Sequence, residues 1–378
     1  MPLGSSVPSS LQAILNIAEE TKISALLGAL FDPKLPGALL VALLYYPHKL
    51  KSIVPIRVHS CITSSAFVRT AEILLAFGIL RRINHKLSQL VLNNWKGDAK
   101  FIKSQELVLI TGGSSGIGEV MARDFSSKGV KVVVMDLNPP KDPFPPNVFY
   151  YQVDITSSSQ IASAASEIRK GQGDPTVIIN NAGLGYLRPI LEGTEAQTRK
   201  TFDVNTISHF LMAREFLPAM IKKNHGHVVT IASMASYLVH AANVDYACSK
   251  ASALAFHEGL ASELRVRYNA PNIRTTVVNP SWIRTPLIAY LIAQPTFKDT
   301  VLAPETVTKA IVNQVLSGRS GQLLLPSKMH IMSTIRAWPW WLQTSFRNLI
   351  APALLFVEKP SQPESAGQIG GVAPAAST

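Results

Sequence analysis

Short apolar runs alternate with amphipathic stretches through the middle of the chain. Between two of these runs, residues 159–170 show helical periodicity. A continuous apolar run is typical of a strand that is buried on both faces, as strands are in parallel sheets. Alternation of such strands with helices predicts an α/β fold with a doubly wound parallel sheet. The runs lie at 107–110, 130–135, 149–153, 177–179, 275–279 and 322–326.

The N-terminal region has a different pattern, in which apolar runs at 23–31, 37–46 and 73–80 are separated by charged residues and prolines. Each run is shorter than the roughly 20 apolar residues that cross a bilayer. Basic residues border the runs, which suits a monotopic or shallow hairpin anchor at the headgroup level. We expect a membrane anchor over residues 1–103, with helices packed on the catalytic core as the alternative. The bordering basic residues are Lys49, Lys51, Arg81, Arg82 and Lys86.

The region after the last run is apolar again. Tryptophans at 338, 340 and 341 lie beside Arg336 and Arg347, and residues 349–357 form a further apolar run. Tryptophan is enriched where a protein meets the membrane–water interface. We therefore expect residues 329–357 to be a membrane-associated helical extension. The tail at 358–378 is rich in Pro, Gly, Ala and Ser and is predicted to be disordered.

The chain carries a formal net charge of +12. A basic excess is typical of proteins that bind nucleic acid or an anionic membrane surface. The absence of a basic block with interleaved aromatics, and of zinc-finger spacing, argues against nucleic acid. The histidines have no Cys or Glu partners at metal-ligand spacing, so we predict no metal site. The two cysteines, Cys61 and Cys248, imply no disulfide framework, and we expect Cys248 to be a small buried thiol.

A glycine-rich sequence, Thr-Gly-Gly-Ser-Ser-Gly-Ile-Gly at 111–118, lies between the apolar run at 107–110 and a helical stretch at 119–127. Its defining glycines are Gly112, Gly116 and Gly118. A glycine-rich turn between a strand and a helix presents backbone N–H groups and the positive end of the helix dipole to an anion. The sequence therefore predicts a site for the phosphates of a dinucleotide.

A carboxylate follows each of the next two apolar runs. Asp136 ends the run at 130–135, about 20 residues beyond the glycines, where an acidic residue commonly bonds the adenosine ribose. Its charge would also repel a 2′-phosphate, and the loop has no Arg or Lys to attract one. We therefore favour NAD(H) as the cofactor, with NADP(H) possible. Asp154 ends the third run, at a position that suits the adenine edge.

Tyr246 and Lys250 lie four residues apart in a stretch without Gly or Pro, and so on one face of a predicted helix. A free phenol has a pKa near ~10 and is a poor acid or base at neutral pH. An ammonium group one turn away stabilises the phenolate, and we expect Lys250 to lower the pKa of Tyr246. An ordinary half-exposed helix face is the alternative interpretation of the pair taken alone.

From residue 104 to about 325, the chain resembles the short-chain dehydrogenase/reductase family. Within it, the chain is similar to the membrane-anchored retinol, steroid and fatty-alcohol dehydrogenases. The chain departs from the family at Ser281, where a glycine is usual. The matching elements are the sequence at 111–118, Asp154, Asn-Asn-Ala-Gly at 180–183, Asn205, Ser233 and Tyr-Ala-Cys-Ser-Lys at 246–250.

The resemblance implies a role for each matching residue. Tyr246 exchanges a proton with the substrate oxygen, and Lys250 lowers its pKa and bonds the nicotinamide ribose. Ser233 hydrogen-bonds the substrate oxygen, and Asn205 helps to hold a water that links the lysine to solvent. The catalytic domain spans 104–328. The implied cofactor site comprises Gly112, Ser114, Ser115, Gly116, Ile117, Gly118, Asp136, Asp154, Ile155, Asn181, Ala182, Gly183, Tyr246, Lys250, Ile283 and Thr285.

The combined expectation is an NAD(P)-dependent oxidoreductase that interconverts an alcohol and its carbonyl on a lipophilic substrate of retinoid, steroid or long-chain type. The apolar stretch at 287–293 would close over such a substrate. We expect the enzyme, possibly a homodimer, on the endoplasmic reticulum or lipid droplets, with its catalytic domain facing the cytosol. The alternatives are a soluble NADP(H)-dependent ketoreductase and a non-catalytic nucleotide-binding scaffold at a membrane.

Overall fold

The structure, a computed structural model, describes residues 31–295 and 297–354. The chain divides into two compact units, Met1–Val91 and Leu92–Thr378. This division falls at Val91 rather than at residue 103, because the residues after it bond to the unit that contains the sheet. The run expected at 23–31 lies almost wholly outside the described residues, and so do residues 355–357 and the tail at 358–378.

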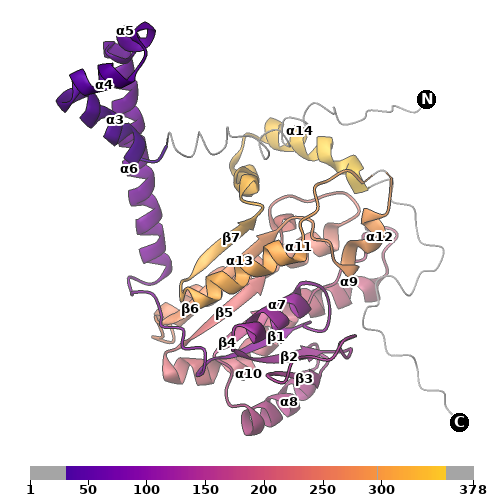
Figure 1. Ribbon diagram of the computed structural model, residues 1–378. Coiled ribbons are helices and arrows are strands. Elements are labelled where there is room, and N and C mark those ends of the chain that lie inside the picture. Colours follow the sequence, from indigo (N-terminus) through magenta and orange to yellow (C-terminus); the bar gives the residue numbers. More distant parts are fainter. Residues whose placement is uncertain (1–30, 296, 355–378) are drawn as a thin grey trace, which may run out of the picture. The chain divides into compact units, whose positions relative to one another are not determined.

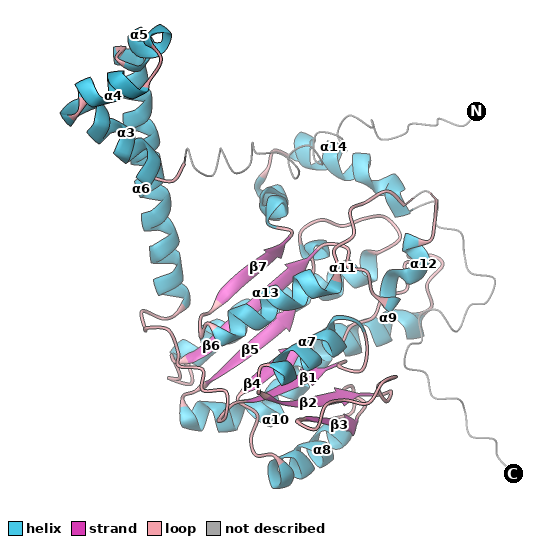
Figure 2. Ribbon diagram, in the orientation of Figure 1, coloured by secondary structure: helices cyan, strands magenta, loops and turns pink. Residues whose placement is uncertain are grey.

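The described part of the first unit is helical (Figures 1 and 2). Helix α3 packs on the long helix α6: a Cβ added to Gly37 would lie 3.4 Å from Leu75, and one added to Gly78 would lie 2.9 Å from the Phe31 carbonyl oxygen. An ion pair between Asp32 and Arg82, 2.8 Å long, joins the same segments. The helices are α3 (Lys34–Tyr45), α4 (Pro47–Ile53), α5 (His59–Ile62) and α6 (Ser65–Leu92), with a 3₁₀ turn, η1, at Ile56–Val58.

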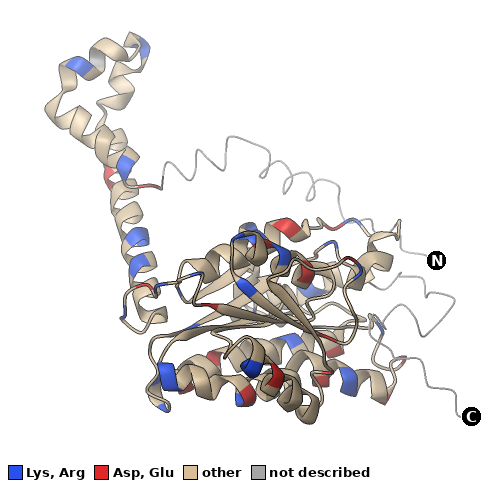
Figure 3. Ribbon diagram, turned by 60° about the horizontal axis from the view of Figure 1, so that its bottom comes forward, with Lys and Arg blue, Asp and Glu red and all other residues tan. Residues whose placement is uncertain are grey.

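Large apolar side chains of this unit are exposed, and Figure 3 shows that most of its ribbon carries no charged residue. They include Leu44, Tyr45, Ile53, Ile56, Ile73, Phe77 and Leu80. Within the described residues, no helix alone has the length and apolar character of a membrane span. One pair of helical stretches reaches that length and apolar character when the two are taken together. They are Ile56–Ile62 and Ser65–Leu92, which meet at a bend of 65°.

The second unit is built on a seven-stranded parallel sheet in the order β3-β2-β1-β4-β5-β6-β7 (Figure 2). This confirms the predicted doubly wound α/β fold. Strand β1 pairs with β2 on one side and with β4 on the other, so the direction of winding reverses between β1 and β4. The strands are β1 (Leu107–Thr111), β2 (Lys131–Asp136), β3 (Val148–Gln152), β4 (Val177–Asn180), β5 (Gly226–Ile231), β6 (Ile273–Pro280) and β7 (Gly321–Leu325).

Helices cover both faces of the sheet (Figure 1). Side chains of α7 and α13, such as Phe125 and Ile311, pack on one face, and side chains of α8, α10 and α11, such as Ile161 and Phe216, pack on the other. The core therefore lies in two layers, which explains why the central strands are apolar throughout. The helices are α7 (Gly116–Ser127), α8 (Ser158–Gly171), α9 (Glu195–Phe202), α10 (Ser208–Lys223), α11 (Val244–Val266), α12 (Ala289–Ile292) and α13 (Pro304–Leu316).

Strand β5 was not predicted from the apolar pattern. It reads Gly-His-Val-Val-Thr-Ile, and polar residues leave only two consecutive apolar positions in its middle. The polar side chains are nevertheless buried. His227 is buried because its ring nitrogen hydrogen-bonds Thr276 Oγ1 on β6 at 2.8 Å, a pairing across strands that sequence periodicity does not reveal.

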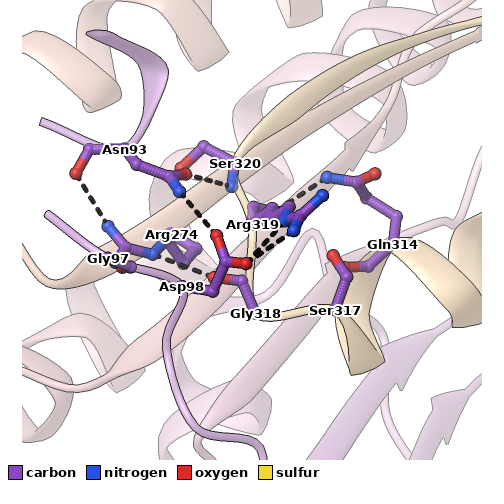
Figure 4. Close-up of polar contacts among 9 residues, drawn as sticks. All are labelled: Asn93, Gly97, Asp98, Arg274, Gln314, Ser317, Gly318, Arg319 and Ser320. Carbon is purple, nitrogen blue, oxygen red and sulfur yellow. Dashed lines mark hydrogen bonds and ion pairs between the residues drawn. The ribbon is translucent and has the colours of Figure 1, made fainter. Parts of the chain in front are cut away.

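Arg274 of β6 ties the start of the second unit to the sheet (Figure 4). Its side chain is buried, with 2% of the residue exposed. Asp98 forms an ion pair with Arg319, at 2.7 Å, and the Ala99 N–H donates to the Gly318 carbonyl at 2.9 Å. These contacts hold residues 93–99 against the start of β6 and the turn before β7. The Arg274 guanidinium donates to the carbonyls of Asn93 (3.1 Å), Gly97 (2.6 Å), Pro271 (3.3 Å) and Gly318 (3.1 Å).

Candidate active site

The carboxyl ends of β1 and β4 border the point where the strand order reverses, which is where doubly wound sheets bind ligands. Thr111 ends β1, and its Oγ1 accepts the backbone N–H groups of Asn181 (3.0 Å) and Ala182 (3.1 Å). The Asn181 amide donates in turn to the carbonyls of Thr111 and Gly112, both at 2.9 Å. The segment after β4 therefore holds the glycine-rich loop in place.

The glycine-rich loop needs glycine at each of its defining positions. Gly112 and Gly116 have φ values of +64° and +57°, in the left-handed region that favours glycine. A Cβ on Gly118 would lie 2.1 Å from the Gly112 carbonyl oxygen. Helix α7 begins at Gly116, and Ser115 at its N-cap makes no side-chain cap bond. The free N–H groups of the first turn and the helix dipole are thus available to an anion.

Asp136, the last residue of β2, binds this loop directly. Its Oδ2 accepts the Ser114 N–H at 3.0 Å, and its Oδ1 accepts the Asn138 N–H at 3.1 Å. The Ser114 hydroxyl beside it is buried and has no hydrogen-bond partner in the structure. A buried hydroxyl without a partner is costly, so a ligand oxygen or nitrogen at this place would stabilise it. The donor groups, the glycine cradle and this hydroxyl fit a dinucleotide.

The Asp154 carboxylate contacts Thr156 and Lys200. Its Oδ1 accepts from the Thr156 N–H (2.9 Å) and hydroxyl (2.7 Å), and Lys200 Nζ lies 3.6 Å from Oδ2. Burial works to raise the pKa of Asp154, but the Thr156 hydrogen bonds and the Lys200 charge outweigh it, and the pKa is lowered. Ile155, expected at the cofactor, is buried in the core cluster beneath α8.

The segment after β6 approaches the glycine-rich loop. Thr285 Cγ2 lies 3.5 Å from the position of a Cβ at Gly116, so the structure brings these two predicted cofactor residues together. Ile283 forms an isolated β-bridge and packs on the core. Ser281 replaces the glycine of the family without strain, because its φ is not positive and its N–H donates to the Leu325 carbonyl at 2.7 Å.

Ser233 and Tyr246 meet at the carboxyl end of β5. Ser233 starts the short helix η3 (Met234–Ser236), and its Oγ accepts the Ala235 N–H at 3.1 Å and donates to the Pro280 carbonyl at 3.4 Å. Tyr246 lies in the first turn of α11. Burial raises the pKa of its phenol, and a hydrogen bond with Ser233 acts in the opposite direction.

On balance the pKa of Tyr246 is raised by burial in this structure, whereas we expected Lys250 to lower it. The Lys250 ammonium lies 5.7 Å from the centre of the tyrosine ring and donates to the Ile231 carbonyl at 2.9 Å. No carboxylate of the described residues forms an ion pair with it, and burial lowers the pKa of Lys250 to about 8. The lysine and the tyrosine nevertheless share one face of α11, and burial makes both sensitive to any charge brought beside them.

Asn205 lies in a π-helical turn, η2 (Asp203–Ile207), between α9 and α10. Its amide donates to the Leu184 carbonyl (2.8 Å) and to Ser249 Oγ (3.0 Å), and its oxygen accepts the Leu184 N–H (2.9 Å). The side chain therefore fixes the loop after β4 against α11. A π turn is frequent at functional sites because it breaks the regular backbone ladder.

Two serines in or near α11 donate hydrogen bonds to its backbone carbonyls. Ser249 Oγ donates to the Tyr246 carbonyl at 2.7 Å while it accepts from Asn205. Ser236 Oγ, fully buried, donates to the Lys250 carbonyl at 2.8 Å. The Ser236 contact joins the short helix η3 to α11, whereas the Ser249 contact lies within α11, and the only signal for either in the sequence is its proximity to the Tyr246–Lys250 pair.

Gly185 was also missed by the sequence analysis. A Cβ at this position would lie 2.9 Å from Tyr246 Cδ2. Only a glycine lets the loop after β4 approach the catalytic ring this closely. This contact defines the wall of the site next to the tyrosine.

We expect Gly185→Ala to displace the Tyr246 ring and to lower kcat/KM by at least about tenfold, since a small misplacement of a reacting group costs up to ~10² in rate. Steady-state kinetics measure it. Gly259→Ala is the matched control, because a Cβ at Gly259, in the same helix as Tyr246, meets nothing within 4 Å. Equal activity of the two variants would show that the ring tolerates the extra methyl group.

Cys248 is exposed rather than buried as expected. Two residues from Tyr246, it points to the other side of α11, so its thiol does not share the face of the catalytic pair. There it borders a cavity of about 220 Å³ between α9 and the start of α11. Tyr186, Arg188, Phe202, Val244 and Asp245 also line this cavity.

Comparison with known proteins agrees with this geometry. The model of the family described as short chain dehydrogenase matches residues 106–295. "Dehydrogenase RED2" of Cochliobolus heterostrophus is 45% identical over 218 residues, which cover 57% of this chain and 81% of that protein. Estradiol 17-beta-dehydrogenase 11 of Macaca fascicularis is 32% identical over 238 residues, covering 61% and 78%.

A solved structure shows the same fold. The 3-ketoacyl-(acyl-carrier-protein) reductase from Brucella melitensis complexed with NADH superposes with a TM-score of 0.51 at 22% identity, covering 58% of this chain and 96% of that one. The family match and the relatives settle the class of protein. The chain belongs to the short-chain dehydrogenase family and is an NAD(P)-binding oxidoreductase that acts on CH–OH groups.

Proposed function

We propose that the protein interconverts a lipophilic alcohol and its carbonyl compound, with Tyr246 as the general acid and base. The observation that carries this proposal is the meeting of Ser233, Tyr246 and Lys250 at the carboxyl end of β5, beside the loop that fits a dinucleotide. A non-catalytic scaffold would need none of these three side chains.

In this reaction, the charge that changes lies on one substrate oxygen. When bound, the nicotinamide cofactor accepts or supplies the hydride at the adjacent carbon. The Tyr246 hydroxyl gives the proton to that oxygen in reduction and takes it in oxidation. Ser233 offers a second hydrogen bond to the same oxygen, and the contacts of Ser236 with Lys250 and of Ser249 with Asn205 hold α11 in place.

The cofactor that we propose is NAD(H). The support is the Asp136 carboxylate, which sits on the loop through its bond to the Ser114 N–H and places a negative charge where a 2′-phosphate would lie. The residues that would hold the dinucleotide are the loop at 112–118, Asp136, Asp154, the segment at 181–183, Lys250 and Thr285.

We expect Asp136→Asn to reduce the preference for NAD over NADP by about tenfold or more, because the amide removes the repulsive charge and keeps an oxygen for the Ser114 N–H. The ratio of kcat/KM values for the two cofactors measures it. Asp142→Asn in the exposed loop after β2 is the control for net charge. A wild-type enzyme that already prefers NADPH would contradict the assignment.

A lipophilic substrate is supported by an apolar cluster beside the catalytic residues. Leu187 lies two residues after Gly185, which is close to the Tyr246 ring. Trp282 lies two residues after Pro280, whose carbonyl accepts from the Ser233 hydroxyl. Both pack in one cluster with Ile288 and Leu291 of the segment expected to close over the substrate. That segment forms a 3₁₀ turn, η4 (Pro286–Ile288), and the short helix α12. An apolar cluster beside a substrate site favours apolar substrates.

The direct test is a panel of retinoid, steroid and long-chain alcohols, with their short water-soluble analogues, assayed with NAD and with NADP. We expect kcat/KM to rise with the apolar area of the substrate, because the cluster removes that area from water. Turnover confined to small polar alcohols would overturn the lipophilic assignment and leave the soluble ketoreductase as the better proposal.

We also propose that the protein resides on the endoplasmic reticulum or on lipid droplets with its catalytic domain facing the cytosol. The support is the exposed apolar surface of the first unit and the basic residues around it, such as Arg81 and Lys86. The relatives named as estradiol dehydrogenases act on an apolar molecule by name, which fits the same setting. A homodimer stays a prediction.

Full-length protein is expected to sediment with membranes and to resist carbonate extraction, whereas protein that begins at Leu92 is expected to shift toward the soluble fraction. Starting at Leu92 keeps residues 93–99, which Arg274 holds. Fractionation with antibody detection measures both. If the full-length protein were freely soluble, the anchor hypothesis would be rejected in favour of the alternative, in which the helices of the first unit pack on the core.

A further inference from the structure

Residues 327–354, which we call the strap, lie beyond the last strand of the sheet and return to the catalytic site. The strap comprises a 3₁₀ segment η5 (Ser327–Ala337), helix α14 (Trp340–Ile350) and a final turn η6 (Ala351–Leu354). In Figure 1 it lies near the carboxyl ends of the strands, on the same side as α12. A strap in this place borders any path to Tyr246.

The N-terminal part of the strap is hydrogen-bonded to the short helix η3. Arg336 Nη2 donates to the Ser236 carbonyl at 2.7 Å, and Ser236 Oγ donates to the Lys250 carbonyl. Ile335 beside it is fully buried. Gln343 of α14 is buried too, and its amide donates to the Trp338 carbonyl at 2.7 Å, which fixes the helix to the preceding turn.

The C-terminal end of the strap packs on the segment that we expect to cover the substrate. Leu354 is 3% exposed and packs in the cluster that contains Ala242, Ile288 and Leu291. Helix α14 therefore spans between two contacts with the site and cannot move far from it.

Helix α14 exposes four large apolar side chains. Trp340 and Trp341 are 77% and 71% exposed, and Leu342 and Leu349 are 36% and 45% exposed. The other exposed residues of the helix are Thr344, Ser345 and Asn348. The whole strap contains no Asp or Glu but carries Lys328, Arg336 and Arg347. Exposed tryptophans with basic and no acidic neighbours are typical of a helix that lies in the headgroup region of an anionic membrane.

We propose that α14 binds a lipid surface with anionic headgroups and holds the entrance of the substrate site against it, so that substrate passes directly from lipid to Tyr246. The proposal rests on the lipophilic substrate proposed above. It assigns a lipid contact to the catalytic unit itself, separate from any contact that the first unit makes.

Tryptophan quenching tests the contact in the full-length protein. Trp95→Phe protein, which removes the exposed tryptophan just after α6, is bound to vesicles of phosphatidylcholine and phosphatidylserine that contain brominated acyl chains. We expect brominated lipid to quench its emission, and the added changes Trp340→Phe and Trp341→Phe to remove most of that quenching. Trp338→Phe in the same background is the matched control, since Trp338 packs on Phe346 inside the strap.

Kinetics test the delivery of substrate. We expect Trp340→Ser with Trp341→Ser to raise KM by about tenfold for a long-chain alcohol embedded in the vesicles, and to leave KM for a short water-soluble alcohol unchanged, because only the first substrate uses the lipid contact. Val266→Ser, which removes an exposed apolar side chain at the far end of α11, is the control.

Three results would overturn the proposal. One is quenching of Trp340 and Trp341 by aqueous iodide but not by brominated lipid. Another is an equal loss of activity on both alcohols, which would indicate a purely structural strap. The third is protection of the tryptophans by self-association without lipid. A wild-type enzyme that turns over neither alcohol would refute the proposed substrate class, while the quenching result would still decide the lipid contact.

Discussion

Tyr246→Phe is expected to lower turnover by about 10²–10⁴-fold, the usual contribution of a positioned general acid or base. The phenylalanine ring keeps the contact with Gly185 and the packing of α11, and only the hydroxyl that shares a hydrogen bond with Ser233 is lost. Cofactor binding is expected to persist, because the glycine-rich loop and Asp136 hold the dinucleotide. Steady-state turnover and cofactor titration by fluorescence measure the two effects separately.

The control for this prediction is Tyr237→Phe. The Tyr237 hydroxyl, nine positions earlier in the chain, hydrogen-bonds Gln322 on β7 and not Ser233. We expect this variant to keep most of its activity. If Tyr246→Phe retained more than about a tenth of wild-type turnover, the proton transfer would belong to another group, and the proposed mechanism would be wrong.

The sequence predicted the sheet well because parallel strands are buried on both faces. Strands such as β1, β2 and β4 are nearly continuous apolar runs, and each observed limit lies within one residue of the predicted one. Helix α7 begins at Gly116 instead of residue 119, because its first turn is part of the glycine-rich loop. Strand β5 escaped prediction because His227 and Thr230 are polar yet buried.

The candidate site was predictable as a set of residues but not as a set of contacts. The motif spacing brought Ser233, Tyr246 and Lys250 together, and the structure places them at one strand end. The direction in which the Lys250 ammonium points was not predictable, because it depends on the Ile231 carbonyl and on burial. The partners of Asn205 were not predictable either, since they come from the loop after β4. Contacts between distant segments leave no periodic signal in a single sequence.

Arg274 is the most demanding of these unpredicted contacts. It is a buried cation to which no carboxylate is bonded in the part of the chain that the structure describes, and four backbone carbonyls accept from its guanidinium instead (Figure 4). Two of those carbonyls, from Asn93 and Gly97, belong to the segment that precedes the sheet. Removal of the side chain would leave buried acceptors without donors, which costs about 1–3 kcal/mol for each group that water cannot reach.

Arg274→Met is therefore expected to lower the free energy of unfolding of the catalytic unit by roughly 3–5 kcal/mol, because methionine fills the space but donates no hydrogen bond. Urea denaturation followed by circular dichroism measures the change. Arg319→Met is the matched control: Arg319 lies in the same cluster, but its ion pair with Asp98 is about half exposed, so we expect the unfolding midpoint to stay close to that of the wild type. Equal shifts of the midpoint in the two variants would mean that water replaces the guanidinium, and that Arg274 does not fix residues 93–99 to the sheet.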